Sequence, residues 1–165
     1  MSRYRPPQKP TAKYITVEGE ARLKEELHRL WIVERPKITQ SVSEAAAMGD
    51  RSENADYIYG KKRLLEINRR VRYLGKRLEE ITVVSESPTD RNKIFFGATE
   101  SLEDEGGNSY RYRLVGPDEI DPSRGYISID SPMGKALLSK QLDAEVKIES
   151  PTGQKYYSVL AIDYG

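Results

Sequence analysis

The sequence predicts two domains of different class, an all-α antiparallel coiled-coil hairpin followed by an α+β domain with an antiparallel sheet. An uninterrupted heptad pattern of apolar residues predicts the hairpin, because such a seam is typical of a helix that packs along a partner. Its members are Leu64, Ile67, Val71, Leu74, Leu78 and Ile81. After residue 87 short apolar runs alternate with Gly, Pro and Asp turns, which predicts strands. Because 32% of the 165 residues are charged, the apolar residues suffice only for modest cores.

The first helix of the hairpin is expected from Val17 to about Met48, with Thr16 available as its N-cap. Pro36 removes one helical hydrogen bond and crowds the preceding turn. We therefore expect a kink or local unwinding near residues 34–35 within an otherwise long helix. Trp31 lies at helical spacing on the apolar stripe and is expected in the core of the hairpin.

The second helix is expected from Tyr57 to Ile81, with the first helix as its partner. Residues 45–52 between the helices are too few for anything but a tight reversal, so the two helices should run antiparallel in a domain of residues 14–84. Residues 1–13 carry four basic side chains, three prolines and no acid. This composition predicts a flexible basic tail, to which we assign no role.

The C-terminal domain is expected to span residues 88–165 as an antiparallel sheet of about five strands with one helix. The helix is placed at Met133–Ser139, because Ser131 and Pro132 suit its N-cap and first position. The strands are placed at residues 94–102, 110–115, 126–129, 146–148 and 156–162.

The composition excludes several classes of function. The chain has no cysteine and one histidine, which removes disulfide frameworks, thiol catalysis, cysteine-ligated zinc and histidine-rich metal sites. A self-sufficient hydrolase would have to rely on carboxylates alone. No apolar run approaches the roughly 20 residues of a membrane span, and no secretory signal is evident. We therefore expect a cytoplasmic protein without a membrane partner.

The charge is distributed unevenly, although the formal net charge is only +1. Residues 1–87 hold 18 basic and 13 acidic side chains, whereas residues 88–165 hold 9 and 13. Many of the basic residues recur at heptad spacing on the second helix, where like charges repel one another. They are Lys61, Lys62, Arg63, Arg69, Arg70, Arg72, Lys76 and Arg77. A single-sign stripe favours a polyanionic partner such as RNA or DNA, and the alternative is a solvated coiled-coil face.

Two acids lie between the helices, Asp50 and Glu53, three residues apart. This spacing is typical of a capping box at the start of the second helix. The same two carboxylates could instead help to hold a hard cation such as Mg²⁺ at the end of the hairpin. Mg²⁺ prefers about six oxygen ligands, so two carboxylates would need a partner molecule to complete the site.

Five segments carry a resemblance to a known family: Leu30–Trp31, Glu34–Pro36, Gly49–Tyr57, Lys61–Leu74 and Tyr126–Met133. In this order they resemble the bacterial Gre transcript cleavage factors. The likeness runs from about Tyr14 to Tyr164, and the Arg-Ser pair between the acids and the long basic stripe are closer to the GreB type than to the GreA type.

The resemblance implies a coiled coil that enters the secondary channel of RNA polymerase and an FKBP-like domain that docks at the channel entrance. It implies that Asp50 and Glu53 hold a second Mg²⁺ jointly with the polymerase and position the attacking water. The polymerase itself would then cut backtracked nascent RNA, and the factor, a monomer, would be no enzyme on its own. The basic stripe would contact the extruded RNA 3′ segment. Met133, Leu137 and Leu138 could dock on the polymerase, although burial against their own sheet is favoured.

Two other functions remain open from the sequence. A secondary-channel regulator could use the same hairpin to occlude the polymerase without stimulating cleavage, and it would not need Asp50 and Glu53 at this spacing. A plain RNA-binding coiled coil would need the basic stripe but not the acids.

Overall fold

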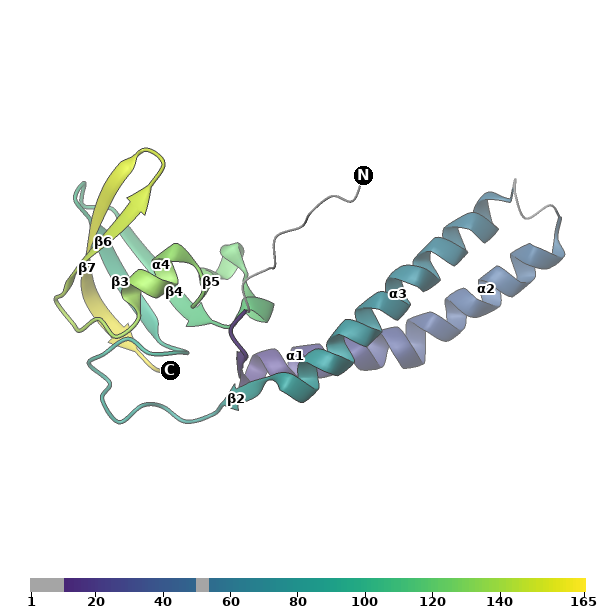
Figure 1. The fold of residues 1–165 in the computed structure, drawn as a ribbon, viewed down its shortest axis with the longest axis horizontal. Coiled ribbons are helices and arrows are strands. Elements are labelled where there is room, and N and C mark those ends of the chain that lie inside the picture. Colours follow the sequence, from purple (N-terminus) through teal and green to yellow (C-terminus); the bar gives the residue numbers. More distant parts are fainter. Residues whose placement is uncertain (1–10, 50–53) are drawn as a thin grey trace, which may run out of the picture. The chain divides into compact units, whose positions relative to one another are not determined.

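The computed structural model describes residues 11–49 and 54–165 (Figure 1). These residues divide into a helical unit of residues 18–81 and a sheet unit, which combines residues 11–17 with 82–165. A short strand on each side of the hairpin, Tyr14–Thr16 and Thr82–Val84, belongs to the sheet unit. Within the described residues, no helix is long and apolar enough to cross a membrane.

The helical unit contains one interrupted helix and one continuous helix. The first arm consists of α1 (Val17–His28), a π-helical segment (Arg29–Glu34) and α2 (Arg35–Ala47), and the second arm is α3 (Ala55–Glu80). Helices α2 and α3 pack side by side and are joined by a short connection (Figure 1). The unwinding predicted next to Pro36 is confirmed, since proline cannot donate the helical hydrogen bond and the wider π turn ends just before it.

The seam between the arms is narrow. Among its described apolar residues, the most deeply buried are Leu23, Leu30, Ala45, Ile67 and Leu74. The prediction that Trp31 lies in this core is wrong, because Trp31 is 47% exposed and the Arg35 guanidinium lies 4.8 Å from the centre of its ring. Leu30, one heptad after Leu23, is buried in the seam, and Trp31 lies one helical position away from that face.

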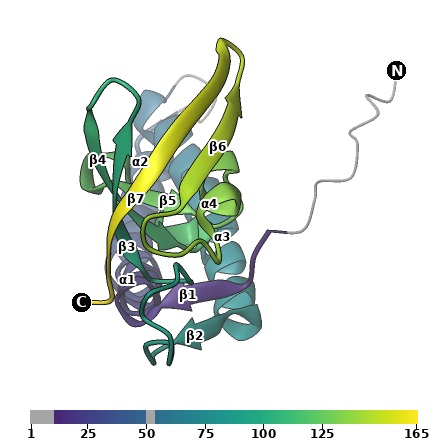
Figure 2. The same ribbon diagram turned by 90° about the vertical axis from the view of Figure 1, so that its left-hand side faces the viewer.

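Two short strands flank the helical unit in the sequence and pair with each other. Strand β1 (Tyr14–Thr16) runs parallel to β2 (Thr82–Val84) in a two-stranded sheet, seen in Figure 2. Thr16 precedes α1 as predicted, and its hydroxyl donates a hydrogen bond to the Glu119 carboxylate, which also accepts the Thr16 backbone N–H at 3.1 Å. Glu119 therefore ties β1 to the rest of the sheet unit.

The main sheet of this unit has five strands in the order β5-β4-β3-β7-β6. The strands are β3 (Thr99–Asp104), β4 (Ser109–Val115), β5 (Tyr126–Ser128), β6 (Glu145–Ser150) and β7 (Gly153–Asp163). The predicted purely antiparallel sheet is wrong in one place, because β4 and β5 are parallel. Residues 116–125 between them form two 3-10 turns that carry the chain back to the end of the sheet where β4 began.

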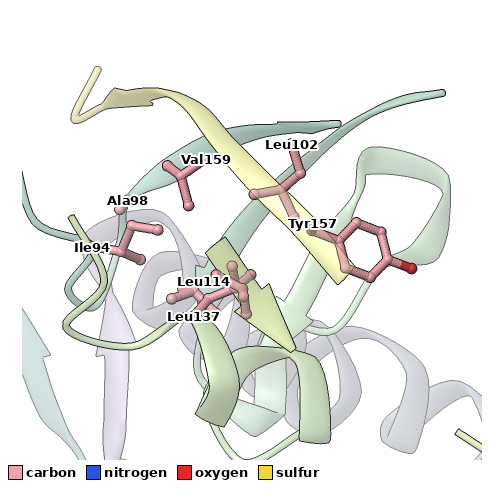
Figure 3. Packing of buried hydrophobic residues seen from close by; sticks show 8 residues of the cluster. Ile94, Ala98, Leu102, Leu114, Leu137, Tyr157 and Val159 are labelled. Atoms are coloured by element: carbon pink, nitrogen blue, oxygen red, sulfur yellow. The ribbon is translucent and has the colours of Figure 1, made fainter. Parts of the chain in front are cut away.

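A compact apolar core lies beneath this sheet (Figure 3). It is formed by Ile94, Ala98, Leu102, Leu114, Leu137, Val146, Tyr157 and Val159. Leu137 reaches it from the short helix α4 (Pro132–Leu137), and Met133 packs against it, whereas Leu138 is 40% exposed. Of the three residues considered for docking, Leu138 is therefore the most exposed. The predicted strand from residue 94 begins only at Thr99, although Ile94 and Ala98 are core residues.

One carboxyl group lies inside the sheet unit. Glu100 of β3 is fully buried, and neither of its carboxylate oxygens has a hydrogen-bond partner among the described residues. It shares a face of the strand with Leu102, two residues further on, which points into the core. Burial raises the pKa of Glu100 to about 8, so the carboxyl is mainly protonated at neutral pH. The period-two alternation of inward and outward positions along β3 is the sequence signal that could have placed Glu100 on the same face as Leu102.

Candidate functional site

The two acids predicted to act at the end of the hairpin, Asp50 and Glu53, lie outside the described residues. Beside them Asn54 is the N-cap of α3, because its side-chain oxygen accepts the Tyr57 backbone N–H at 3.1 Å. The Asn54 amide also donates to the Ala45 carbonyl at 2.7 Å, which links the end of α2 to the start of α3. The helix therefore begins later than the predicted capping box requires, and Asp50 is not needed as the N-cap of α3.

A close approach of the two arms lies six residues beyond Asn54, at Gly60. Gly60 of α3 is buried, and a Cβ atom at this position would lie 2.4 Å from Cγ2 of Val42 on α2. Only glycine therefore allows the arms to meet at this distance. The close approach and the Asn54 bridge together hold the described end of the hairpin.

The predicted basic stripe of α3 faces acids of the first arm along one side. The Arg63 Nε donates to the Glu34 carboxylate at 2.7 Å, and the Arg63 Nη1 lies 3.3 Å from the Glu66 carboxylate on its own helix. The Arg70 guanidinium donates two hydrogen bonds to the Glu26 carboxylate, at 2.7 and 3.0 Å. Such pairs beside an apolar seam orient two helices against each other.

The electrostatics of these pairs follow from their geometry. The hydrogen bond from Arg70 lowers the pKa of Glu26, and the hydrogen bond to Glu34 raises the pKa of Arg63. Arg77, the third member of this column, is buried. The prediction of a stripe with charges of one sign is therefore wrong on this side, because Glu26 and Glu34 of the first arm lie against it. Heptad spacing within one helix cannot reveal acids on the other arm.

The other basic residues of α3 point into solvent. We define the basic face as Lys61, Lys62, Arg69, Arg72 and Lys76, which are all exposed. Lys76 lies 4.0 Å from Glu80, an exposed contact of little energetic weight. The structure thus separates the predicted stripe into a column that pairs with the first arm and a face available to a partner.

A metal site is not found in the part of the chain that the structure describes. There, no group of three or more His, Cys, Asp or Glu side chains could hold an ion. The prediction of a shared Mg²⁺ site at Asp50 and Glu53 concerns residues outside that part and stays a prediction.

The comparisons with known families cover almost the entire chain. The family described as "Transcription elongation factor, N-terminal" matches residues 13–83. The family described as "Transcription elongation factor, GreA/GreB, C-term" matches residues 88–164. The chain belongs to the GreA/GreB family of transcription elongation factors. The Gre resemblance inferred from the motifs is thereby confirmed.

Relatives of this Gre factor match it over nearly its full length. Transcription elongation factor GreB of Pseudomonas aeruginosa is 59% identical over 164 residues, with 99% of this chain and 98% of the relative covered. The protein of the same name from Xanthomonas axonopodis pv. citri is 55% identical over 165 residues, with 99% and 98% covered.

The solved structures that are similar to this chain include that of GreA factor homolog 1 (Gfh1) of Thermus thermophilus. It is 25% identical, with 92% of this chain and 99% of that chain covered, and the TM-score is 0.41. At this score the superposition adds nothing to the sequence matches.

Several residues of this Gre factor that shape the site were not predicted. Glu26 and Glu34 supply the partners of the basic column, and Asn54 joins the arms. Asn54 had a usable signal, since Asn before an acidic first turn is a preferred N-cap. The pairing of Glu26 and Glu34 required the register of the two arms, which local spacing does not contain.

Proposed function

We propose that this Gre factor enters the secondary channel of RNA polymerase and stimulates the polymerase's own cleavage of backtracked nascent RNA, so that elongation resumes. The helical unit acts as an antiparallel coiled coil that reaches toward the polymerase active site, and the sheet unit acts as an FKBP-like docking domain. The factor works as a cytoplasmic monomer and has no nuclease activity of its own.

The observation that carries this proposal is the location of Asp50 and Glu53 in the short connection between α2 and α3, within a chain of the GreA/GreB family. Asn54 and Gly60 hold the two helix ends together beside this connection. Because the N-cap of α3 is Asn54, the proposal does not require Asp50 to cap this helix.

The donor set fits a shared magnesium site. Carboxylate oxygens are ligands that Mg²⁺ prefers, but two carboxylates fill only part of its octahedral shell, so the remaining ligands must come from the polymerase and the RNA. When bound, the ion would lower the pKa of a coordinated water and stabilise the leaving oxygen. Asp50 and Glu53 would contribute ligands and accept hydrogen bonds from the attacking water, which orients it toward the phosphodiester.

The basic face has a complementary part in the proposal. Its exposed cations would contact phosphates of the RNA 3′ segment that backtracking extrudes, through interactions that weaken with salt. Arg63, Arg70 and Arg77, also predicted to contact RNA, would act mainly by orienting the arms, because they are paired or buried in the helical unit.

The test uses stalled, backtracked elongation complexes with Mg²⁺ and follows the release of short RNA 3′ fragments. We expect Asp50→Ala with Glu53→Ala to reduce stimulated cleavage by about 10²-fold or more while polymerase binding is retained. Glu44→Ala is the matched control, because it removes an exposed acid from the same end of α2 and should leave cleavage unchanged.

Equal cleavage rates for the doubly substituted and unmodified chains would overturn the proposed mechanism. If neither chain stimulates cleavage although both bind the polymerase, the protein is instead a regulator that occludes the channel.

A further inference from the structure

Tyr59 on α3 presents an unusually open aromatic ring. It is 68% exposed, whereas Tyr73, two heptads further along the same helix, is 46% exposed. The Arg70 guanidinium lies 5.2 Å from the centre of the Tyr73 ring and covers part of it. Single exposed aromatic side chains are common on protein surfaces, so exposure alone assigns Tyr59 no role.

A hollow beside Tyr59 supplies a second observation. Its volume is about 360 Å³, which is within the range of small-molecule sites. The hollow lies between the π-helical segment and α3, both within the helical unit. Its walls are formed by Glu34, Tyr59, Lys62, Arg63 and Glu66. One aromatic ring, two cations and two carboxylates thus surround a space large enough for a nucleobase.

The chemistry of these walls suits a nucleotide better than a bare phosphate. An aromatic ring stacks on the face of any base. Lys62 follows Tyr59 by three residues, on a neighbouring helix position, and its exposed ammonium can hold a phosphate. Glu66 can accept hydrogen bonds from base N–H groups. Arg63 is engaged by both carboxylates of the hollow, which keeps it along the wall.

We propose that Tyr59 is a stacking platform for one base of single-stranded RNA, with the neighbouring phosphate held by Lys62. The inference rests on the proposed function in one respect, because it requires RNA to pass along α3. It adds a contact to a base on a surface whose other assigned contacts are to phosphates. Tyr59 lies six residues beyond Glu53 in the sequence, so the base would belong to the RNA segment nearest Asp50 and Glu53.

The test measures binding of the full chain to a labelled single-stranded RNA of about 12 nucleotides by fluorescence anisotropy over a range of salt concentrations. Inorganic polyphosphate, a polyanion without bases, is the second probe. We expect Tyr59→Ala to weaken RNA binding by roughly 5- to 100-fold, with polyphosphate binding and the salt dependence unchanged. Tyr59→Phe retains the ring and should bind RNA like the unmodified chain.

Matched variants separate stacking from charge. Tyr73→Ala should lose less RNA affinity than Tyr59→Ala, because Arg70 already covers the Tyr73 ring. Lys62→Ala and Arg69→Ala should weaken binding to both probes and reduce the slope of log affinity against log salt by about 0.7 each.

Unchanged RNA affinity of Tyr59→Ala, or an equal loss for RNA and polyphosphate, would overturn the inference. A loss confined to binding of polymerase that lacks RNA would also overturn it and assign the ring to a protein surface. If Lys62→Ala and Arg69→Ala also leave RNA affinity unchanged, the RNA path of the proposed function fails. If only Tyr59→Ala has no effect, stacking fails and that path is retained.

Discussion

The helical unit and the sheet unit treat charged side chains in opposite ways. In the helical unit, Arg63 and Arg70 pair with acids across a narrow seam, where all four side chains retain contact with water. In the sheet unit, Glu100 lies inside an apolar core without a hydrogen-bond partner among the described residues. Partly solvated pairs contribute little stability but orient two helices, whereas an unpaired buried carboxyl is costly once it ionises. The charged pairs therefore orient the two arms of the helical unit, whereas the buried Glu100 makes the stability of the sheet unit depend on pH.

The largest effect should come from Glu100→Gln in the sheet unit. The folded pKa of about 8 lies above the unfolded value near 4.5, so the folded state holds a proton that the unfolded state loses first. The free energy of unfolding should therefore fall as pH rises from about 4.5 to about 8, by about 3 kcal/mol at pH 7. Glu100→Gln should remove this decline and stabilise the unit at pH 8, with little change at pH 5.

Hydrogen exchange of the β3 and β7 amides over this pH range measures the effect. Glu103→Gln is the matched control, since Glu103 lies on the same strand and is exposed. Parallel pH profiles for Glu100→Gln and the unmodified chain would show that Glu100 does not carry the pH dependence.

An intermediate effect is expected from glycine substitutions in α3. Gly60→Ala would place a Cβ atom 2.4 Å from Cγ2 of Val42, and we expect a loss of about 1–3 kcal/mol in the stability of the hairpin. Gly75→Ala is the control, because no heavy atom lies within 4 Å of its added Cβ, and it should stabilise the helix by up to about 1 kcal/mol. Urea unfolding followed by helical circular dichroism measures both, and equal effects would contradict the close approach of the arms.

The smallest effect should come from the ion pair between Arg70 and Glu26. A double-mutant cycle with Arg70→Ala and Glu26→Ala should give a coupling below about 1 kcal/mol that weakens with salt, because both side chains are partly solvated. The pKa of Glu26 is lowered by Arg70, so the coupling should be present at neutral pH and decline as the pH falls through that lowered value. A cycle that combines Glu26→Ala with Arg69→Ala should give no coupling. A coupling above 2 kcal/mol that persists at high salt would contradict the solvated character of the pair.

The sequence alone predicted the two arms of the hairpin and the five strands of the main sheet, but not β1 and β2, and its motifs pointed to the family. The heptad pattern predicted α3 to within a few residues, since a long apolar period is a local property. Tyr110–Val115 and Tyr126–Ile129 were also placed close to β4 and β5, because turn residues bound them. Asp50 and Glu53 were selected by spacing and family motifs, and that selection stays a prediction.

Only the tertiary structure decided what faces each of these elements. Periodicity put Arg63 and Arg70 beside the seam but could not reveal that Glu34 and Glu26, 29 and 44 residues away, lie opposite. The parallel pairing of β4 with β5 and of β1 with β2 depends on the path of the connecting chain, which strand patterns do not encode. The physical reason is the same in each case. A local pattern determines which face of an element is apolar, whereas ion pairs, strand direction and the burial of Glu100 depend on residues that only folding brings together.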